Sequence, residues 1–135
     1  MSSSVACIDY REGKILIAKR IERGDMGGRW EFPGGKLEEG EDFSAAIKRE
    51  MQEEFSSDCR IFEELASGTF KHKGADCSVR AFRIKLDKDG ITSPFVLTEH
   101  TQTRWVEPCE IEKLDFVDSD LNIFEQIKKS LGIGE

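Results

Sequence analysis

Residues 33–55 read PGGKLEEGEDFSAAIKREMQEEF, a glycine-rich turn followed by a stretch with helical periodicity. Pro33 restricts its own backbone angle φ, and the two glycines after it tolerate the positive φ values found in tight turns. From Asp42 to Phe55 the apolar side chains recur every three or four residues, which predicts an amphipathic helix. Negative charge just before this helix, at Glu41, interacts favourably with its positively polarised N-terminus. The segment therefore predicts a turn that leads directly into a helix.

Two glutamates of this helix lie on the face that is expected to contact the protein core. At about 100° per residue the apolar positions form one stripe, and Glu50 and Glu54 fall within it, with Glu53 at its edge. The stripe consists of Phe43, Ala46, Ile47, Met51 and Phe55. A solvated acidic face would instead lie opposite the stripe. Carboxylates at this spacing repel one another, and they lie near the negatively polarised C-terminus of the helix. A hard divalent cation with oxygen ligands relieves these penalties, and Mg²⁺ is the natural candidate.

The turn before the helix adds a second chemical feature. Gly34 and Gly35 let backbone approach a ligand closely, and Lys36 offers an ammonium group to a phosphate. Alone, the glycine pair fits an ordinary loop equally well. Together with the acidic cluster it predicts a phosphate–metal site, in which metal activates water and neutralises charge on the leaving phosphate.

A longer spacing pattern runs through the same segment. Gly35 is followed after five residues by Glu41, and after seven more by the run REMQEE at residues 49–54. This pattern resembles the Nudix box, and a chance match is on the order of one in ten thousand. Ser56 and Ser57 stand where the box usually has Gly and an aliphatic residue. That departure concerns the exit from the helix, where Gly is favoured, and leaves the carboxylates untouched.

The resemblance covers nearly the whole chain and points to one branch of the Nudix family. Residues 29–41, 99–106 and 114–116 are similar to MutT-like enzymes, a branch that includes nucleotide-pool-cleaning enzymes and CTP pyrophosphohydrolases. The resemblance implies a single Nudix domain over residues 1–135. It also implies an α/β (α+β) fold, in which a mixed β-sheet is sandwiched between helices.

By this resemblance a metal site is assigned to five residues, with Mg²⁺ as the cofactor and Mn²⁺ as a substitute. The ligands are the carboxylates of Glu50, Glu53, Glu54 and Glu99 and the carbonyl of Gly34. Glu99 matches a position that supplies either a metal ligand or a catalytic carboxylate, although the sequence alone identifies only a charge in a loop.

Further roles follow from the same resemblance. Arg49 would orient the glutamates through a charge-assisted hydrogen bond, and it belongs with Glu53, Glu54 and Glu99 to the predicted catalytic set. Arg20 and Lys36 would contact the phosphates of the substrate.

The base of the nucleotide is predicted to meet Asp120, at the start of the last helix. An ionised Asp only accepts hydrogen bonds, which favours bases with amino or imino protons such as cytosine or forms of adenine and guanine. Helix N-capping explains an acidic residue here equally well. Phe32 and Phe70 are candidates to pack against the base, with core packing as the alternative for each.

The leading functional prediction is a Mg²⁺-dependent nucleoside triphosphate pyrophosphohydrolase. It would hydrolyse (d)NTPs, with CTP, dCTP or oxidised dGTP as candidate substrates, to NMP and pyrophosphate, as in nucleotide-pool sanitation. A dinucleotide or nucleotide sugar is the alternative substrate, but it would call for an added loop or domain. A non-catalytic Nudix-like binding module is a further alternative, and such a module would be expected to lose box carboxylates that are all present here.

Charge and composition exclude several other classes. The net charge of −7 argues against binding of nucleic acid polymers, which relies on basic patches. No apolar run approaches the roughly 18 residues that cross a bilayer, and the first residues lack a basic start typical of signal peptides. We expect a cytoplasmic protein, monomeric or homodimeric, that binds a small nucleotide and no membrane.

The remaining features complete the expected layout. The four cysteines lack CxxC spacing and are expected to be free, mostly buried thiols, whereas His72 and His100 are expected at the surface or in loops. Residues 4–9 and 15–19 are expected to pair as a hairpin. Further strands are expected at residues 61–70, 78–86 and 103–106, and a closing helix at residues 119–131.

Overall fold

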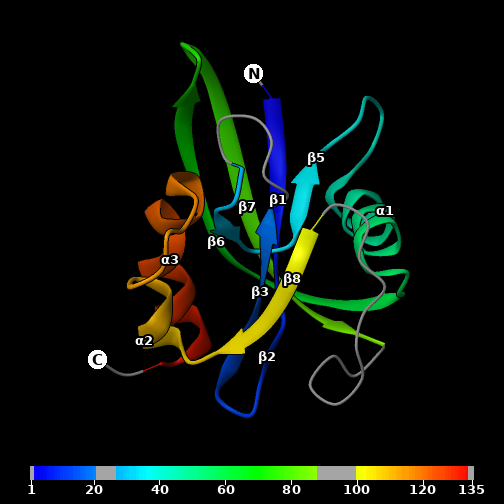
Figure 1. The fold of residues 1–135 in the computed structure, drawn as a ribbon. Coiled ribbons are helices and arrows are strands. Elements are labelled where there is room, and N and C mark those ends of the chain that lie inside the picture. Colours follow the sequence, from blue (N-terminus) through cyan, green and yellow to red (C-terminus); the bar gives the residue numbers. More distant parts are fainter. Residues whose placement is uncertain (1, 21–26, 88–99, 134–135) are drawn as a thin grey trace.

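Two β-sheets lie between helices in the computed structural model, which describes residues 2–20, 27–87 and 100–133 (Figure 1). The first sheet has the strand order β5 (Gly34–Lys36), β1 (Ser2–Ile8), β7 (Ala75–Leu86) and β6 (Cys59–His72). This sheet is mixed. Strand β1 runs parallel to β7, whereas the β1–β5 and β6–β7 pairs are antiparallel.

The second sheet is antiparallel and is built around one strand. Strand β3 (Lys14–Arg20) pairs with β2 (Tyr10–Arg11) and β4 (Trp30–Glu31), and also with β8 (His100–Val106). Glu31 lies opposite Ala18 in this sheet. The sheet therefore brings β8 beside β3, although the two strands are far apart in the sequence.

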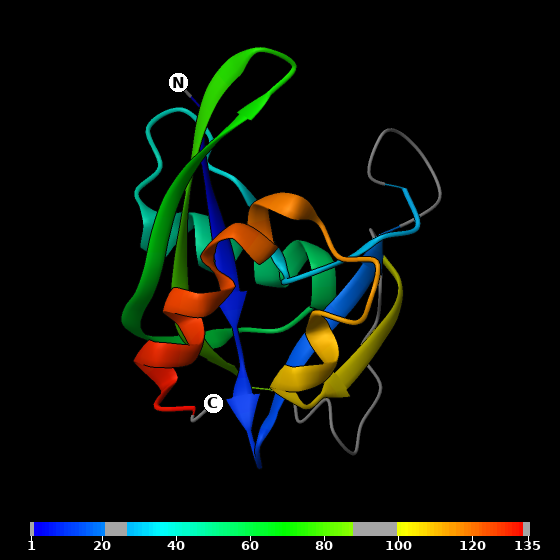
Figure 2. The same ribbon diagram turned by 90° about the vertical axis from the view of Figure 1, so that its left-hand side faces the viewer.

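The helices cover opposite faces of the strands. Helix α1 (Phe43–Phe55) lies on one side, and α2 (Pro108–Ile111) and α3 (Asp118–Leu131) lie on the other; Figure 2 is viewed from the side of α3, with α1 behind the strands. Strand β1 shows the alternation that makes this possible, because Val5 and Cys7 pack in the core under α1 while Ala6 and Ile8 pack in the core under α3. The expected α/β/α arrangement with a mixed sheet is confirmed.

Two local expectations were wrong. The strand at residues 4–9 does not form a hairpin with the next strand, because β1 pairs with β5 and β7, and the hairpin is the short β2–β3 pair. The two glycines after Pro33 are not a turn but begin strand β5, with Gly34 at a φ of 147°. A Cβ at Gly34 would collide with the carbonyl oxygen of Val5, so this position requires glycine for close strand approach.

Among the described residues, no helix is both long enough and apolar enough to cross a membrane. All four cysteines are free thiols, and only Cys109 is exposed. This confirms the expectation of mostly buried thiols.

Helix α1 begins and ends with recognisable caps. The Asp42 side chain caps its N-terminus by accepting a hydrogen bond from Ala45 N at 2.8 Å. At the C-terminus Ser56 adopts the left-handed conformation, with φ 52° and ψ 41°, and its N–H donates to Gln52 O at 2.9 Å. Ser56 thus takes the left-handed conformation that glycine adopts at most helix ends of this kind.

Replacing Ser56 with Gly is expected to stabilise the protein. A side chain in the left-handed region costs about 1–2 kcal/mol, and Ser56→Gly removes this cost. Part of the resulting gain in stability is offset because glycine is more flexible in the unfolded chain. We expect the free energy of unfolding to rise by about 1 kcal/mol in urea denaturation. Ser56→Ala is the control and should give no such gain; equal stability of the Gly and Ala variants would contradict this account.

Candidate active site

An open cleft of about 1130 Å³ brings most of the predicted site residues together. Its walls come from strands of both sheets (β1 and β3 to β8), from α1 and from the first turn of α3, and its size suits a small-molecule ligand. The predicted site residues that line it are Arg20, Phe32, Gly34, Lys36, Glu50, Glu54, Phe70 and Asp120. Arg49 and Glu53 lie beside the cleft rather than in its wall. Glu99 lies outside the described residues.

Two helix carboxylates are buried where α1 meets strand β5. Glu50 is 7% exposed and Glu54 is 1% exposed, so the expectation that both lie on the core-facing side is confirmed. A Cβ at Gly35 would come within 2.5 Å of Glu50 Oε1, so a larger residue there would displace the Glu50 carboxylate. Glu54 Oε1 accepts a hydrogen bond from Gly34 N at 3.4 Å. The carboxylates therefore face the backbone of the glycine strand directly.

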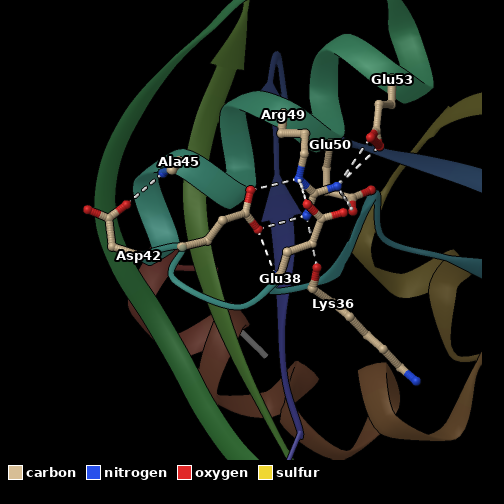
Figure 3. Close-up of polar contacts among 8 residues, drawn as sticks. Lys36, Glu38, Asp42, Ala45, Arg49, Glu50 and Glu53 are labelled. Carbon is tan, nitrogen blue, oxygen red and sulfur yellow. Dashed lines mark hydrogen bonds and ion pairs between the residues drawn. The ribbon is translucent and has the colours of Figure 1, made fainter.

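Arg49 connects several acidic groups around this helix (Figure 3). Its Nε and Nη2 donate to the two oxygens of Glu41 at 2.7 and 2.9 Å. Its Nη1 donates to Glu50 Oε1 at 2.8 Å and to Glu53 Oε2 at 3.1 Å, and Nη2 also reaches Lys36 O at 3.0 Å. The hydrogen bond from Arg49 lowers the pKa of Glu41 to about 2. One guanidinium thus holds the three carboxylates of Glu41, Glu50 and Glu53 and also the backbone carbonyl of Lys36.

The donor chemistry of these residues fits a divalent cation. Glu50, Glu53 and Glu54 offer carboxylate oxygens, the ligands that hard cations prefer. The absence of a side chain at Gly35 leaves room for the Glu50 carboxylate. The carboxylates are not gathered about a single point, because within the described part of the chain no three acidic, His or Cys side chains enclose a metal position. The Glu53 side chain is 46% exposed and is held by Arg49.

Two further residues of the site, Glu31 and His100, were not identified from the sequence. His100 is buried, and its Nε2 lies 2.9 Å from Glu31 Oε2 while its Nδ1 lies 3.8 Å from Glu54 Oε1. The imidazole also stacks on Phe55. The expectation that His100 lies at the surface or in a loop is therefore wrong. Extending the predicted strand at residues 103–106 toward its N-terminus would have placed His100 in the sheet.

The two predicted phosphate-binding residues differ in their surroundings. Arg20 Nη1 donates to Glu31 Oε1 at 3.0 Å, and its side chain is 42% exposed. Lys36 is exposed, and in Figure 3 its side chain extends away from the Arg49 cluster. Both line the cleft, so the cleft carries positive charge beside the buried carboxylates.

Asp120 lies in the cleft wall and does not cap its helix. The N-cap position of α3 belongs to Val117, and Asp120 Oδ2 instead accepts a hydrogen bond from Phe32 N at 2.9 Å. The N-capping alternative is therefore wrong. Burial raises the pKa of Asp120 to about 7, and the negative charge of Glu31 adds to the effect. Near neutral pH this carboxyl group is divided between a form that only accepts hydrogen bonds and a form that also donates one.

The two predicted base-stacking residues occupy different environments. Phe32 is 3% exposed and packs edge-on against Phe116, with ring centroids 5.0 Å apart, so most of its surface belongs to the core. Phe70 is partly buried and packs against the same core cluster. Both still contribute to the cleft wall.

Comparison with known proteins identifies the family. Residues 2–127 match the model of the NUDIX domain. The chain is 32% identical over 125 residues to the CTP pyrophosphohydrolase of Escherichia coli K12, covering 93% of this chain and 90% of that protein. It is 45% identical over 115 residues to the 8-oxo-dGTP diphosphatase of Haemophilus influenzae, covering 85% and 82%. The chain therefore belongs to the Nudix hydrolase family, whose members generally need divalent metal ions.

Solved structures agree with this assignment. The solution structure of the Escherichia coli ORF135 protein superposes with a TM-score of 0.80 at 29% identity, covering 96% of this chain and 89% of that one. A MutT protein from Methanosarcina mazei has the same fold, with a TM-score of 0.78 at 20% identity over 97% and 93% of the two chains.

Proposed function

We propose that this protein is a Mg²⁺-dependent nucleoside triphosphate pyrophosphohydrolase of the MutT type, with a role in cleaning the nucleotide pool. The observation that carries the proposal is the cleft in which the buried carboxylates of Glu50 and Glu54 face the glycine strand, beside the cations Arg20 and Lys36. Such a cleft suits a polyphosphate and its counter-ion. The names of the similar proteins, a CTP pyrophosphohydrolase and an 8-oxo-dGTP diphosphatase, support a nucleoside triphosphate as the substrate.

The proposed reaction consumes one water and one nucleoside triphosphate. The oxygen of water bonds to phosphorus, the bridge between the α- and β-phosphates breaks, and the products are a nucleoside monophosphate, pyrophosphate and a proton. Glu53, Glu54 or Glu99 accepts that proton. Arg49 holds the carboxylates of Glu50 and Glu53 in place.

The cofactor is proposed to be Mg²⁺, with Mn²⁺ as a substitute. Its ligands would be Glu50, Glu53, Glu54, the Gly34 carbonyl and Glu99. When bound, the cation supplies charge neutralisation at the phosphates and lowers the pKa of the attacking water. Arg20 and Lys36 complement it by binding phosphate oxygens directly.

The base is proposed to meet Asp120 at the α3 side of the cleft. The Phe32 N–H fixes one oxygen of this carboxyl group. In its ionised form the group accepts from the amino group of cytosine, and in its protonated form it donates to a keto oxygen of an oxidised guanine. CTP, dCTP and oxidised dGTP are therefore the proposed substrates.

Removing the Asp120 side chain is expected to weaken base discrimination. Asp120→Ala should raise KM for the preferred nucleotide much more than for dTTP, which has no amino group. Loss of a charge-assisted hydrogen bond costs about 1.5–3 kcal/mol, or roughly ten- to a hundredfold in discrimination. The measurement is kcat/KM for dCTP, dGTP, 8-oxo-dGTP and dTTP, with the melting temperature recorded beside it.

The pH dependence provides the control for this assignment. Because the pKa of Asp120 is raised to about 7, its ionised form gains population as pH rises through 7. The preference for dCTP over dTTP should therefore increase from pH 6 to pH 8. These two values lie about one unit below and one unit above that pKa. In Asp120→Asn this change should vanish. An unchanged order of preference in the Ala variant, with only a lowered melting temperature, would refute the base-reading role.

A substrate screen tests the proposed activity as a whole. Wild-type protein is incubated with each common and oxidised nucleoside triphosphate, with Mg²⁺ or with EDTA, and pyrophosphate is measured. We expect Mg²⁺-dependent release from at least one of CTP, dCTP and 8-oxo-dGTP. Cleavage of only a dinucleotide or a nucleotide sugar in the same assay would overturn the proposed substrate class.

A further inference from the structure

Glu31 is bound on both of its carboxylate oxygens by residues of neighbouring strands. Oε1 accepts from Arg20 Nη1 at 3.0 Å, and Oε2 lies 2.9 Å from His100 Nε2. The three residues belong to β4, β3 and β8, and Arg20 lies directly opposite His100 in the β3–β8 pairing. The strand register of the second sheet therefore places a carboxylate, a guanidinium and an imidazole side by side at the cleft.

The inner end of this group is held firmly. The His100 side chain is 3% exposed and its ring stacks parallel to the Phe55 ring, with an interplanar angle of 6°. His100 Nε2 lies within hydrogen-bonding distance of Glu31 Oε2, at 2.9 Å. His100 is thus a buried anchor that fixes one oxygen of Glu31.

The outer end of the group is open to the cleft. Side-chain exposure increases from 3% at His100 to 17% at Glu31 and 42% at Arg20. A guanidinium carries several N–H donors, and only Nη1 of Arg20 has an acceptor among the described residues. Glu31 therefore restrains the direction of the guanidinium while leaving other donors for a ligand in the cleft.

We propose that Glu31, anchored by His100, is a positioning residue that aims the guanidinium of Arg20 at the phosphates of the substrate. The inference rests on the proposed function, in which Arg20 binds phosphate. A flexible arginine loses side-chain entropy when it is immobilised by a ligand, and a preset guanidinium loses less. The carboxylate itself repels phosphate, so its presence in the cleft wall is explained by what it does to Arg20.

A double-mutant cycle separates this role from a purely structural one. Binding of imidodiphosphate, a non-hydrolysable diphosphate, is measured by calorimetry with Mg²⁺ for wild type, Glu31→Ala, Arg20→Ala and the double variant. The direct charge effect of Glu31 is present in both backgrounds and cancels in the cycle. Glu31→Ala changes the dissociation constant by one factor in the presence of Arg20 and by another in the Arg20→Ala background. We expect the first factor to be at least fivefold larger, in the direction of weaker binding. Equal factors in both backgrounds, within twofold, would overturn the proposal.

A conservative variant and a matched control complete the experiment. Glu31→Gln keeps an acceptor and the side-chain volume, so it should retain part of the coupling to Arg20. It also keeps the test valid if Glu31→Ala folds poorly. The control is Glu64→Gln, because Glu64 also binds an arginine through both oxygens, at 2.6 and 2.8 Å, but lies outside the cleft lining. It should leave imidodiphosphate binding unchanged.

The binding assay is independent of turnover. For the nucleotide that wild type hydrolyses, Glu31→Gln should raise KM about fivefold or more while kcat stays within about twofold, whereas general damage to the fold lowers kcat as well. If wild type binds imidodiphosphate and the cycle shows coupling, but no nucleoside triphosphate is cleaved, the positioning role stands and the proposed function fails. Wild type that does not bind imidodiphosphate would overturn the positioning role itself.

Discussion

Glu54→Gln is expected to lower kcat/KM at least about a hundredfold, which corresponds to about 2.7 kcal/mol of transition-state stabilisation. Glu54 is 1% exposed and lines the cleft, and its Oε1 contacts the glycine strand. The amide keeps the shape and one acceptor oxygen but loses the charge that a divalent cation requires. Turnover is measured by pyrophosphate release at saturating Mg²⁺.

The same variant should keep or raise the melting temperature without metal. Burial of a charged carboxylate near Glu50 is costly, and the neutral amide removes part of that cost. For Glu53→Gln, which should also lose most turnover, the change in melting temperature is expected to be smaller because Glu53 is 46% exposed. The control is Glu39→Gln, an exposed glutamate of the same segment, which should retain activity within about twofold. Near-normal pyrophosphate release by Glu54→Gln would show that the ligand assignment is wrong.

Arg49→Lys is expected to lower kcat about ten- to a hundredfold, with a smaller rise in KM. The planar guanidinium binds both oxygens of Glu41 and at the same time reaches Glu50 and Glu53. An ammonium group keeps the charge but lacks the fork, so it cannot hold three carboxylates in one arrangement. Steady-state kinetics over a range of nucleotide concentrations separates the two parameters.

The control for Arg49 is another arginine that binds a carboxylate through two nitrogens. Arg80 binds Glu64 in this way outside the cleft lining, so Arg80→Lys should leave kcat unchanged. If Arg49→Lys also leaves kcat unchanged, Arg49 is an ordinary ion-pair partner on the helix surface rather than an orienting residue.

The features that the sequence predicted well are those that depend on local spacing. Helix α1 and the burial of Glu50 and Glu54 follow from residues three and four apart, which share a helix face whatever the rest of the chain does. The mixed sheet and its flanking helices were expected from the family resemblance, which encodes long-range contacts that no local pattern contains.

The features that were missed depend on strand pairing over long distances. Strand β1 pairs with β7, where Ser2 lies opposite Cys77, so the local hairpin signal near the N-terminus was misleading. Glu31 and His100 meet across 69 positions, and neither has a sequence neighbour that predicts the contact. Asp120 bonds to Phe32 across 88 positions, whereas its sequence neighbours left an N-cap and a base-binding role as equal alternatives.

The central claim is tested most directly by identifying the products of one nucleoside triphosphate. Wild-type protein is mixed with the best substrate of the screen, and ³¹P NMR follows the reaction with Mg²⁺, with EDTA and with Glu54→Gln. The proposed function predicts nucleoside monophosphate and pyrophosphate in equal amounts, formed only with Mg²⁺ and at least about a hundredfold more slowly by the variant. Formation of nucleoside diphosphate and orthophosphate, or equal rates with EDTA, would contradict it.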